Sequence, residues 1–304
     1  MYLVKPITIQ KQNIYKQREY RLGENMQINK ILSKVALTAL ISTNVLTSEV
    51  FAETWSTTEV QLQAFGDLER VGTGGTAETT IITFQHAGGW EYGDNFFFID
   101  HSRYSVNNNA NFPVDDSSEF YGEWYSNFSL GAITGNKIAF GPVKDIGIVA
   151  GANFAPDVNS LWVLPGVRFS LDLPGFAFAQ IDVTAYIHQS GGSANSSVFT
   201  VVDEASSFMV DFAWAYPFKI GSTSWSVEGH LEYIDGREQT SNFGSTELES
   251  WILFQPQVRL DLGEALGNKA GRLFVGIEYQ YWKNKLGEKG TNDNAAQFLA
   301  VWRF

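Results

Sequence analysis

The sequence predicts an all-β protein: a transmembrane, antiparallel, up-and-down β-barrel of about twelve strands that follows a cleavable signal peptide. Three observations predict it. Segments in which apolar and polar residues alternate recur along the chain, and helical periodicity is missing after residue 52. Trp and Tyr gather near the ends of these segments. The chain ends in an alternating apolar segment that stops at Phe304.

Composition agrees with an all-β fold. The 304 residues include 28 Gly, 23 Phe, 12 Tyr and 9 Trp, but no Cys. Glycine serves turns and bulges, and aromatic residues favour strands and membrane interfaces. The lack of Cys excludes disulfide bonds and thiolate metal sites.

Residues 26–52 predict a secretory signal peptide. Lys30 and Lys34 precede an apolar run, and small residues before Ala52 fit cleavage after that position. A helical membrane anchor is the weaker alternative, because polar residues cut the run below the roughly 20 residues of a helical span. Residues 1–25 are polar and lysine-rich, and we interpret them as a non-native upstream extension or an extended n-region of the signal.

The mature chain is strongly acidic. Without residues 1–52 it keeps 14 basic and 30 acidic residues, a net charge of −16. Sequence-independent nucleic-acid binding depends on Lys and Arg that neutralise phosphates, so nucleic acid is not an expected partner. The electric field of such a chain favours cations or neutral solutes.

The alternation predicts twelve strands, at about 57–65, 78–86, 95–102, 119–130, 145–153, 161–171, 176–189, 207–216, 225–234, 250–260, 273–281 and 294–304. The hairpin 79–100 is the clearest, and its glycine-rich turn is predicted at 87–94. Connections after odd-numbered strands are polar and mostly long, while most of those after even-numbered strands are tighter. This pattern is typical of outer-membrane barrels and predicts both termini on the periplasmic side.

Each predicted strand has one apolar face. In the first hairpin Ile82 and Phe84 share one face, and Thr83 and Gln85 share the other. Periodicity alone does not separate a soluble sandwich from a membrane barrel. The barrel is favoured by the signal peptide, by the final strand with Ala296, Phe298, Ala300, Trp302 and Phe304 on one face, and by a predicted interfacial girdle. The girdle consists of Trp90, Tyr92, Trp214, Tyr216, Trp225, Trp251, Tyr281 and Trp282.

The polar faces then line a lumen. They carry acids at Asp100, Glu123, Asp182, Asp211, Glu228, Glu232 and Glu278, and bases at Arg168, Arg259 and Arg303. A barrel of this size, partly filled by side chains, is expected to pass small solutes through an acidic bore. The alternative is a ladder of paired charges with a purely structural role, since a polar lumen needs internal hydrogen bonds.

Aromatic residues lie on the same faces, at Phe96, Phe98, Tyr121 and Tyr125, with Tyr186 a further candidate. Rings beside carboxylates suit a planar, neutral, hydroxyl-bearing solute, although each ring could equally pack between strands. The candidate substrate-binding residues are Phe96, Phe98, Asp100, Tyr121, Glu123, Tyr125, Arg168, Asp182, Glu228 and Arg259.

Several segments resemble the Tsx/OmpK family of nucleoside-specific channel-forming proteins. They are I-I-T-F-Q-H-A-G-G-W-E-Y-G-D-N-F-F-F-I-D (81–100), E-F-Y-G-E-W-Y-S-N-F-S-L-G-A-I-T-G (119–135), F-G-P-V-K-D (140–145) and L-P-G-V-R-F-S-L-D-L-P-G-F (164–176). The resemblance implies a monomeric twelve-stranded barrel in the outer membrane of a Gram-negative bacterium, which admits nucleosides and deoxynucleosides by diffusion and often serves as a phage or colicin receptor. One departure is Ser126-Asn127, where many relatives are expected to have Pro-Arg. If that Arg faced the lumen, a binding contact is missing here.

Two other classes of function stay open at this stage. A barrel enzyme, such as a hydrolase, would need a base beside a nucleophile. The four histidines, His86, His101, His188 and His230, stand in no such motif, so we expect no enzyme, no cofactor and no metal site. A receptor or adhesin barrel would act through the loops at 103–118 and 235–249, which are long enough to bind partners or to fold into the lumen.

Overall fold

The computed structural model describes residues 54–72, 75–105, 117–189 and 201–304. The chain divides into two units, Met1–Phe51 and Ala52–Phe304. All described residues belong to the second unit. The predicted upstream extension and signal peptide lie outside the described residues, as does most of the predicted loop 103–118.

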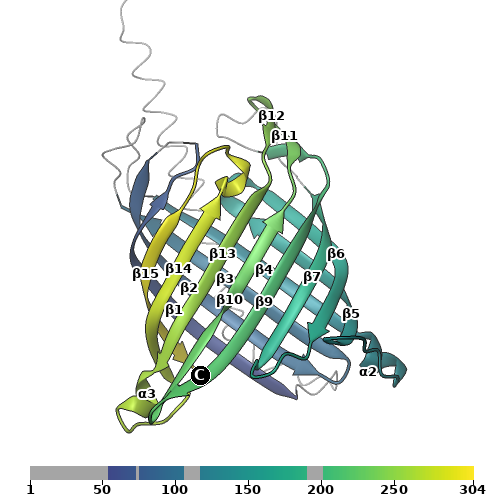
Figure 1. Ribbon diagram of the computed structural model, residues 1–304. Helices are drawn as coiled ribbons and strands as arrows, with labels where there is room; N and C mark the ends of the chain where they lie inside the picture. Colours follow the sequence, from purple (N-terminus) through teal and green to yellow (C-terminus); the bar gives the residue numbers. More distant parts are fainter. Residues whose placement is uncertain (1–53, 73–74, 106–116, 190–200) are drawn as a thin grey trace, which may run out of the picture. The chain divides into compact units, whose positions relative to one another are not determined.

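Twelve antiparallel strands close into a barrel (Figure 1). They are β1 (Trp55–Glu69), β2 (Thr76–Trp90), β3 (Gly93–Tyr104), β4 (Ser117–Ser129), β5 (Val143–Ala155), β6 (Ser160–Leu171), β7 (Phe178–His188), β9 (Ser207–Ile220), β10 (Thr223–Ile234), β13 (Trp251–Asp261), β14 (Leu273–Lys283) and β15 (Asn294–Arg303). The first strand pairs with the last, which leaves no free edge. All twelve predicted strands and the predicted fold class are confirmed.

We call one end of the barrel the turn end, because short connections join β2 to β3 and β9 to β10 there. The predicted turn at 87–94 is wrong in extent. Gly88 and Gly89 stay in the ladder opposite Asn95 and Asp94, so only two residues make the turn. A glycine therefore belongs to a turn only where the pairing between the two strands has ended.

Two longer connections at the turn end contain short helices that the sequence pattern did not predict. They are α2 (Leu130–Thr134) and α3 (Leu262–Ala265). Ser129 caps the first by accepting from the Ala132 amide at 3.0 Å, and Asp261 caps the second by accepting from the Glu264 amide at 2.9 Å. No helix within the described ranges is long and apolar enough to cross a membrane.

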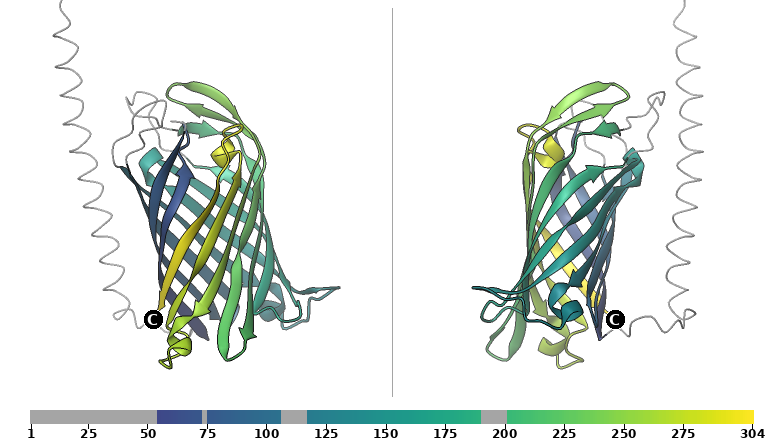
Figure 2. Two further views of the ribbon diagram at one scale, coloured as in Figure 1. Left: turned by 60° about the vertical axis from the view of Figure 1, so that its left-hand side comes forward. Right: turned by 90° about the vertical axis from the view of Figure 1, so that its right-hand side faces the viewer.

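The opposite end, which we call the loop end, carries a second sheet of three strands. These are β8 (Val201–Glu204), β11 (Arg237–Ser241) and β12 (Gly244–Leu248), paired in the order β12-β11-β8. Figure 2 shows this cap sheet at the loop end of the barrel. The short helices η1 (Pro156–Val158) and η2 (Lys285–Gly287) lie in two other connections at this end. The sequence analysis treated all of these segments as loops.

The alternation of each strand separates an outer from an inner face, as predicted. Ile82 is 49% exposed on the outer face, whereas its neighbour Thr83 is buried inside. Other large apolar residues are exposed at outward positions around the whole barrel: Leu62, Trp124, Ile148, Leu161, Phe178, Val183, Phe208, Tyr216, Leu231, Val258, Ile277, Phe298 and Trp302. A soluble sandwich would have buried these side chains. The outer face is therefore an exposed apolar surface, and such surfaces mark sites of contact with a membrane or another protein.

The aromatic positions need one correction. Trp251 and Trp282 were predicted in the outer girdle, but the ladder places them opposite Ile234 and Leu253, whose side chains are buried on the inner face. Both tryptophans therefore point inward. At the end of the chain, Trp302 and Phe304 are exposed outside as predicted, while Val301 is buried inside.

A bulge lengthens β1 beyond its predicted end. Phe65 has a φ of 64°, and the register with β2 shifts between Gln63 and Gly66. The extra residue reverses which positions face inward, so that Leu68 is buried after the bulge as Gln63 is before it. This shift hides the second half of the strand from a search for strict alternation.

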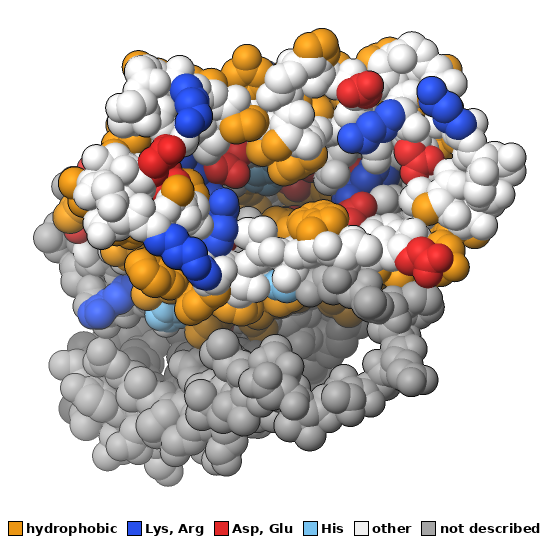
Figure 3. All heavy atoms as spheres, turned by 90° about the horizontal axis from the view of Figure 1, so that it is seen from below, with side chains coloured by type: hydrophobic (Ala, Val, Ile, Leu, Met, Phe, Trp, Pro, Cys, Tyr) orange, Lys and Arg blue, Asp and Glu red, His pale blue; other side chains and the backbone are white. Residues whose placement is uncertain are grey.

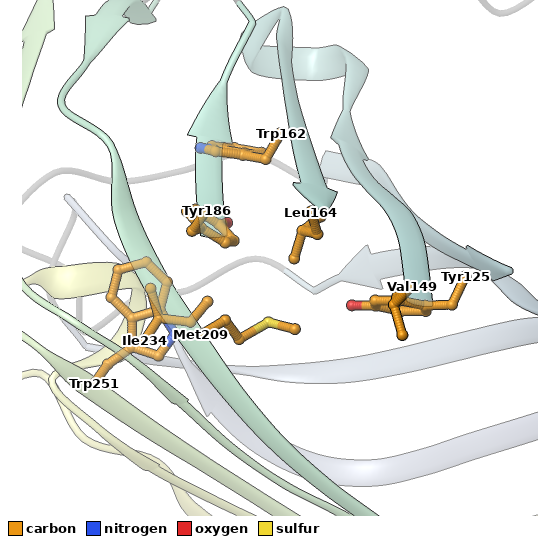
Figure 4. Packing of buried hydrophobic residues seen from close by; sticks show 8 residues of the cluster. All are labelled: Tyr125, Val149, Trp162, Leu164, Tyr186, Met209, Ile234 and Trp251. Atoms are coloured by element: carbon orange, nitrogen blue, oxygen red, sulfur yellow. The ribbon is translucent and has the colours of Figure 1, made fainter. Parts of the chain in front are cut away.

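Part of the lumen is filled by an apolar cluster (Figure 4). It consists of the buried side chains of Tyr125, Val149, Trp162, Leu164, Tyr186, Met209, Ile234 and Trp251, from seven barrel strands. Phe96 and Trp282 pack against it. The cluster runs from the strand ends nearest the cap sheet, where Trp162 and Trp251 lie, to the middle of the barrel, where Tyr125 donates to Glu123.

Candidate solute-binding lumen

All ten predicted binding residues lie on inward positions. The ladder places Phe96, Phe98 and Asp100 of β3 opposite Tyr125, Glu123 and Tyr121 of β4. Arg168 of β6 stands opposite Asp182 of β7, and Glu228 and Arg259 face inward from β10 and β13. Strand alternation was sufficient to find them, because residues opposite each other share a face. Their role in binding stays a prediction.

The first charged network lies near the turn end. Arg168 donates to both carboxylate oxygens of Asp182, from Nε at 2.7 Å and from Nη2 at 2.6 Å. Its Nη1 donates to Asp94 at 2.6 Å, and Asp94 also accepts from Asn127 Nδ2 at 2.8 Å. Asn127 thus faces the lumen, at the position where the resembling family is expected to carry Arg.

The second network spans the opposite part of the wall. Glu59 accepts from Arg303 Nε at 2.7 Å and from Arg259 Nη1 at 3.0 Å. Arg259 also contacts Glu228 at 3.1 Å. Since β14 and β15 separate β13 from β1, the bond from Arg259 to Glu59 crosses a chord of the barrel.

Amide side chains extend this second network. Gln257 donates to Gln61 at 3.1 Å and to Glu278 at 2.5 Å, and Gln63 lies 3.5 Å from the same carboxylate. The sequence analysis named neither Glu59 nor these two glutamines of β1. The available signal was the T-E-V-Q-L-Q alternation inside the predicted strand 57–65.

The predicted arginines are thus all ion-paired inside the barrel. Arg168 and Arg259 are buried, as are Asp182 and Glu59, and each pair is fixed by several hydrogen bonds. A group of this kind holds strands together and narrows the lumen, which agrees with the structural alternative considered for these residues.

Five acids at mid-barrel have no arginine or lysine partner among the described residues: Asp100, Glu123, Asp211, Glu232 and Glu278. Asp100 accepts from Thr83 at 2.6 Å, and Glu123 accepts from the hydroxyls of Tyr121 at 2.6 Å and Tyr125 at 2.9 Å. We call this group the acidic centre. It makes the middle of the lumen a region of negative potential.

One histidine belongs to this centre. His230 Nδ1 lies 3.1 Å from Asp211 Oδ1, and its Nε2 lies 3.0 Å from Gln255 Oε1. The sequence analysis found His230 in no motif, because a motif search does not detect neighbours on other strands.

The part of the lumen that stays accessible has two unlike walls. Phe96, Phe98 and Tyr121 are half-buried. The ring centroid of Phe98 lies 6.1 Å from that of Phe96 and 6.0 Å from that of Tyr121. Asp211 and His230 are half-buried on the other wall, with side-chain exposures of 18% and 27%. In the closed order of twelve strands, β3 stands six places from β10, so an aromatic wall faces a hydrogen-bonding wall.

The turn end shows how the lumen opens. Seen from that end, acidic and histidine side chains lie within a hollow, and both basic and acidic side chains surround its opening (Figure 3). The lumen presents charged side chains to an entering solute, and its aromatic rings offer a surface on which a flat group can stack.

The other histidines have the following contacts in the part of the chain that the structure describes. His86 and His101 lie on the outer face, where they contact Phe97 and Phe120. His188 Nε2 is 3.3 Å from Ser160 Oγ, but both residues are buried and His188 Nδ1 has no hydrogen-bond partner among the described residues. A catalytic histidine is usually oriented by a third group at its other ring nitrogen, and the described residues provide none for His188.

Comparison with known proteins gives the following similarities. No protein-family model matches the chain, and no curated protein matches it. A structure from work on the in-meso crystallization of membrane proteins has a TM-score of 0.38 at 13% identity, covering 82% of this chain and 83% of that one. A bacterial polysaccharide outer membrane secretin has a TM-score of 0.37 at 10% identity, covering 82% of this chain and 98% of that one. The translocator domain of the autotransporter NalP from Neisseria meningitidis has a TM-score of 0.32 at 10% identity, covering 92% of this chain and 98% of that one. The barrel assignment rests on the strand ladder described above.

Proposed function

We propose that this protein is an outer-membrane channel for the passive diffusion of small solutes, and that nucleosides and deoxynucleosides are its preferred class. One observation carries the proposal. The accessible part of the lumen sets the rings of Phe96, Phe98 and Tyr121 against the polar side chains of Asp211 and His230.

The outer face supports a membrane location. Strands of 10 to 15 residues are long enough for a tilted span, which needs roughly 9–11 residues. Apolar side chains are exposed outside while charges are enclosed, the reverse of a soluble protein. The turn end would face the periplasm and the loop end the exterior of a Gram-negative cell. Closure of β1 against β15 leaves no edge for association, which is consistent with a monomer.

The two walls match the two parts of a nucleoside. A base is a flat ring that stacks on aromatic side chains regardless of its identity, at about 1–3 kcal/mol per base. The sugar is neutral and carries hydroxyls, which donate to carboxylates such as Asp100 and Asp211. A solute without a ring would use only the polar wall. The resemblance to the Tsx/OmpK family supports the same class of solute.

The acidic centre adds a charge filter. A nucleoside monophosphate would bring its phosphate into a region that holds five acids without arginine or lysine partners in the described parts of the chain, so its entry is opposed. A neutral nucleoside would meet no such barrier. Its residence would be short, because a channel needs binding that is weak enough for release.

Planar-bilayer recording of the refolded mature protein tests the proposal. We expect a small conductance that falls when adenosine or thymidine is added and stays constant when ribose is added at the same concentration. Equal block by ribose would remove the role of the aromatic wall. Complete absence of current would favour a receptor barrel that binds a phage or colicin through its loops. Turnover of lipid or peptide that a single histidine substitution abolishes would favour an enzyme.

A further inference from the structure

The cap sheet inserts one charged side chain among aromatic rings. Arg237, the first residue of β11, places its guanidinium carbon 4.7 Å from the ring centroid of Tyr186 and 4.5 Å from that of Trp251. Trp162 stacks on Tyr186 with centroids 5.7 Å apart. The three rings come from β6, β7 and β13 and belong to the apolar cluster in the lumen (Figure 4). Tyr186 and Trp251 thus flank the cation, with Trp162 stacked against Tyr186, and aromatic rings on more than one side of a cation form an aromatic cage.

A carboxylate completes the cage. Glu204 of β8 accepts from Arg237 Nε, from Trp162 Nε1 at 2.8 Å and from Gln239 Nε2 at 3.0 Å. Glu204 is 5% exposed and Arg237 is 6% exposed. A planar cation between rings with a carboxylate at its edge suits guanidinium far better than ammonium, because guanidinium both stacks and donates along its edge.

The cage also joins the cap sheet to the barrel. Glu204 and Arg237 belong to the cap sheet, whereas the three rings belong to barrel strands. Beneath them lies Met209, which is fully buried in the apolar cluster. Withdrawal of Arg237 would leave a buried acid unpaired and the rings exposed to water at the loop end.

We propose that Trp162, Tyr186, Trp251 and Glu204 form a binding site for guanidinium-type planar cations at the loop end, and that Arg237 occupies it as an internal ligand. Its occupancy keeps the cap sheet seated over the apolar cluster. The site rests on the contacts of Arg237 and does not depend on which solute crosses the lumen.

Thiol labelling tests the site directly, because the natural chain has no Cys. With Met209→Cys as a reporter, a water-soluble maleimide should react slowly in the otherwise natural protein. Adding Arg237→Ala should raise the labelling rate at least about tenfold, because the buried ion pair and ring contacts that hold the site closed are lost. Unchanged labelling would overturn the proposal.

Chemical rescue identifies the ligand class. Guanidinium ion at millimolar concentration should slow labelling of the Arg237→Ala protein back towards the rate of the protein that keeps Arg237. Urea, which is similar in shape but neutral, should have no effect. Equal effects of the two compounds would show that the vacated space is not a cation site and would overturn the ligand assignment.

Two further variants control for general loosening. Lys289→Ala removes an exposed ion pair with Glu249, of 2.8 Å, at the same end of the barrel, and should leave labelling unchanged. Glu204→Gln keeps the size of the side chain and should raise labelling as Arg237→Ala does. If Lys289→Ala raised labelling equally, the increase would not be specific to the loss of Arg237 from the cage, and the proposal would be overturned. Thiol labelling does not depend on conductance through the barrel. A failure of the proposed cation site can therefore be distinguished from a failure of the proposed channel function.

Discussion

Arg168 and Asp182 face each other across neighbouring strands in a two-bonded ion pair, with Nε to Oδ1 at 2.7 Å and Nη2 to Oδ2 at 2.6 Å. Both side chains are buried inside the barrel. A third bond, from Nη1 to Asp94, ties β6 to β3 across the lumen. Arg168 therefore links its neighbour β7 through Asp182 and the non-adjacent strand β3 through Asp94.

Removal of the arginine should destabilise the barrel. Arg168→Met would leave Asp182 buried without a partner, at a cost of about 3–5 kcal/mol in the free energy of unfolding. Urea unfolding in phospholipid vesicles, followed by tryptophan fluorescence, measures this cost.

The double variant Arg168→Met with Asp182→Leu is the control for the ion pair. It should recover most of the loss, because the unpaired charge is removed together with its partner. A single variant as stable as the natural protein would mean that the pair does not hold these strands together.

The aromatic wall should govern solute binding more than ion flow. Replacing Phe96 and Phe98 by Ala removes two half-buried rings from the lumen and should weaken block by adenosine about fivefold or more, given about 1–3 kcal/mol per stacked base. Basal conductance should change less. Concentration dependence of block in planar bilayers gives the comparison.

Phe97 provides a matched control on the same strand. It lies on the outer face, where its ring stacks on His86. Phe97→Ala removes the same side-chain atoms from the outer face of the barrel and should leave the adenosine block unchanged. A larger change in basal conductance than in block for the inner pair would remove Phe96 and Phe98 from the binding site.

The sequence was sufficient for whatever depends on local periodicity. A two-residue period places every barrel strand and assigns Phe96, Asp100 and Arg168 to the inner face, because a side chain's face follows from its position alone. The girdle assignment of Trp251 and Trp282 failed because it rested on nearness to a strand end, whereas the two-residue period places them on the inner face with Gln255 and Glu278. Aromatic residues near strand ends suit an interface, but the ladder register decides on which side they lie.

What the sequence could not provide depends on distant contacts. Glu59 and Arg259 are 200 residues apart in the chain, so no local pattern pairs them. Glu204 pairs with Gln239 between β8 and β11 of the cap sheet, and these strands are too short for alternation to identify. The degree to which side chains fill the lumen follows from such pairings, and the open part of the site could not be predicted before the register was known.

The acidic centre should make the channel select cations. Asp100 is half-buried at the lumen, and Asp100→Asn removes one negative charge without a large change in volume. Loss of roughly 1 kcal/mol of attraction should lower the ratio of potassium to chloride permeability by up to about fivefold. The reversal potential in a potassium chloride gradient reports this ratio.

Glu78 is the control for charge. It is exposed on β2 and lies on the outer side of the strand, opposite Asp67 of β1. Glu78→Gln changes the net charge of the protein by the same amount but should leave the reversal potential unchanged. Equal shifts for the two variants would mean that selectivity reflects the net charge of the protein rather than the lumen.

Contact between the outer face and lipid should make that face intolerant of charge. Ile277 is 56% exposed in the middle of β14, opposite Val258 and Phe298. Ile277→Arg should cost about 2–4 kcal/mol of stability in vesicles, since arginine is disfavoured at the centre of a bilayer. Ile133 is 50% exposed in α2, at the turn end, and Ile133→Arg should cost about 1 kcal/mol or less because water reaches it. Equal costs for the two substitutions, measured by the same unfolding assay, would show that the outward apolar residues do not meet hydrocarbon, and the lumen would then not be a passage across a membrane.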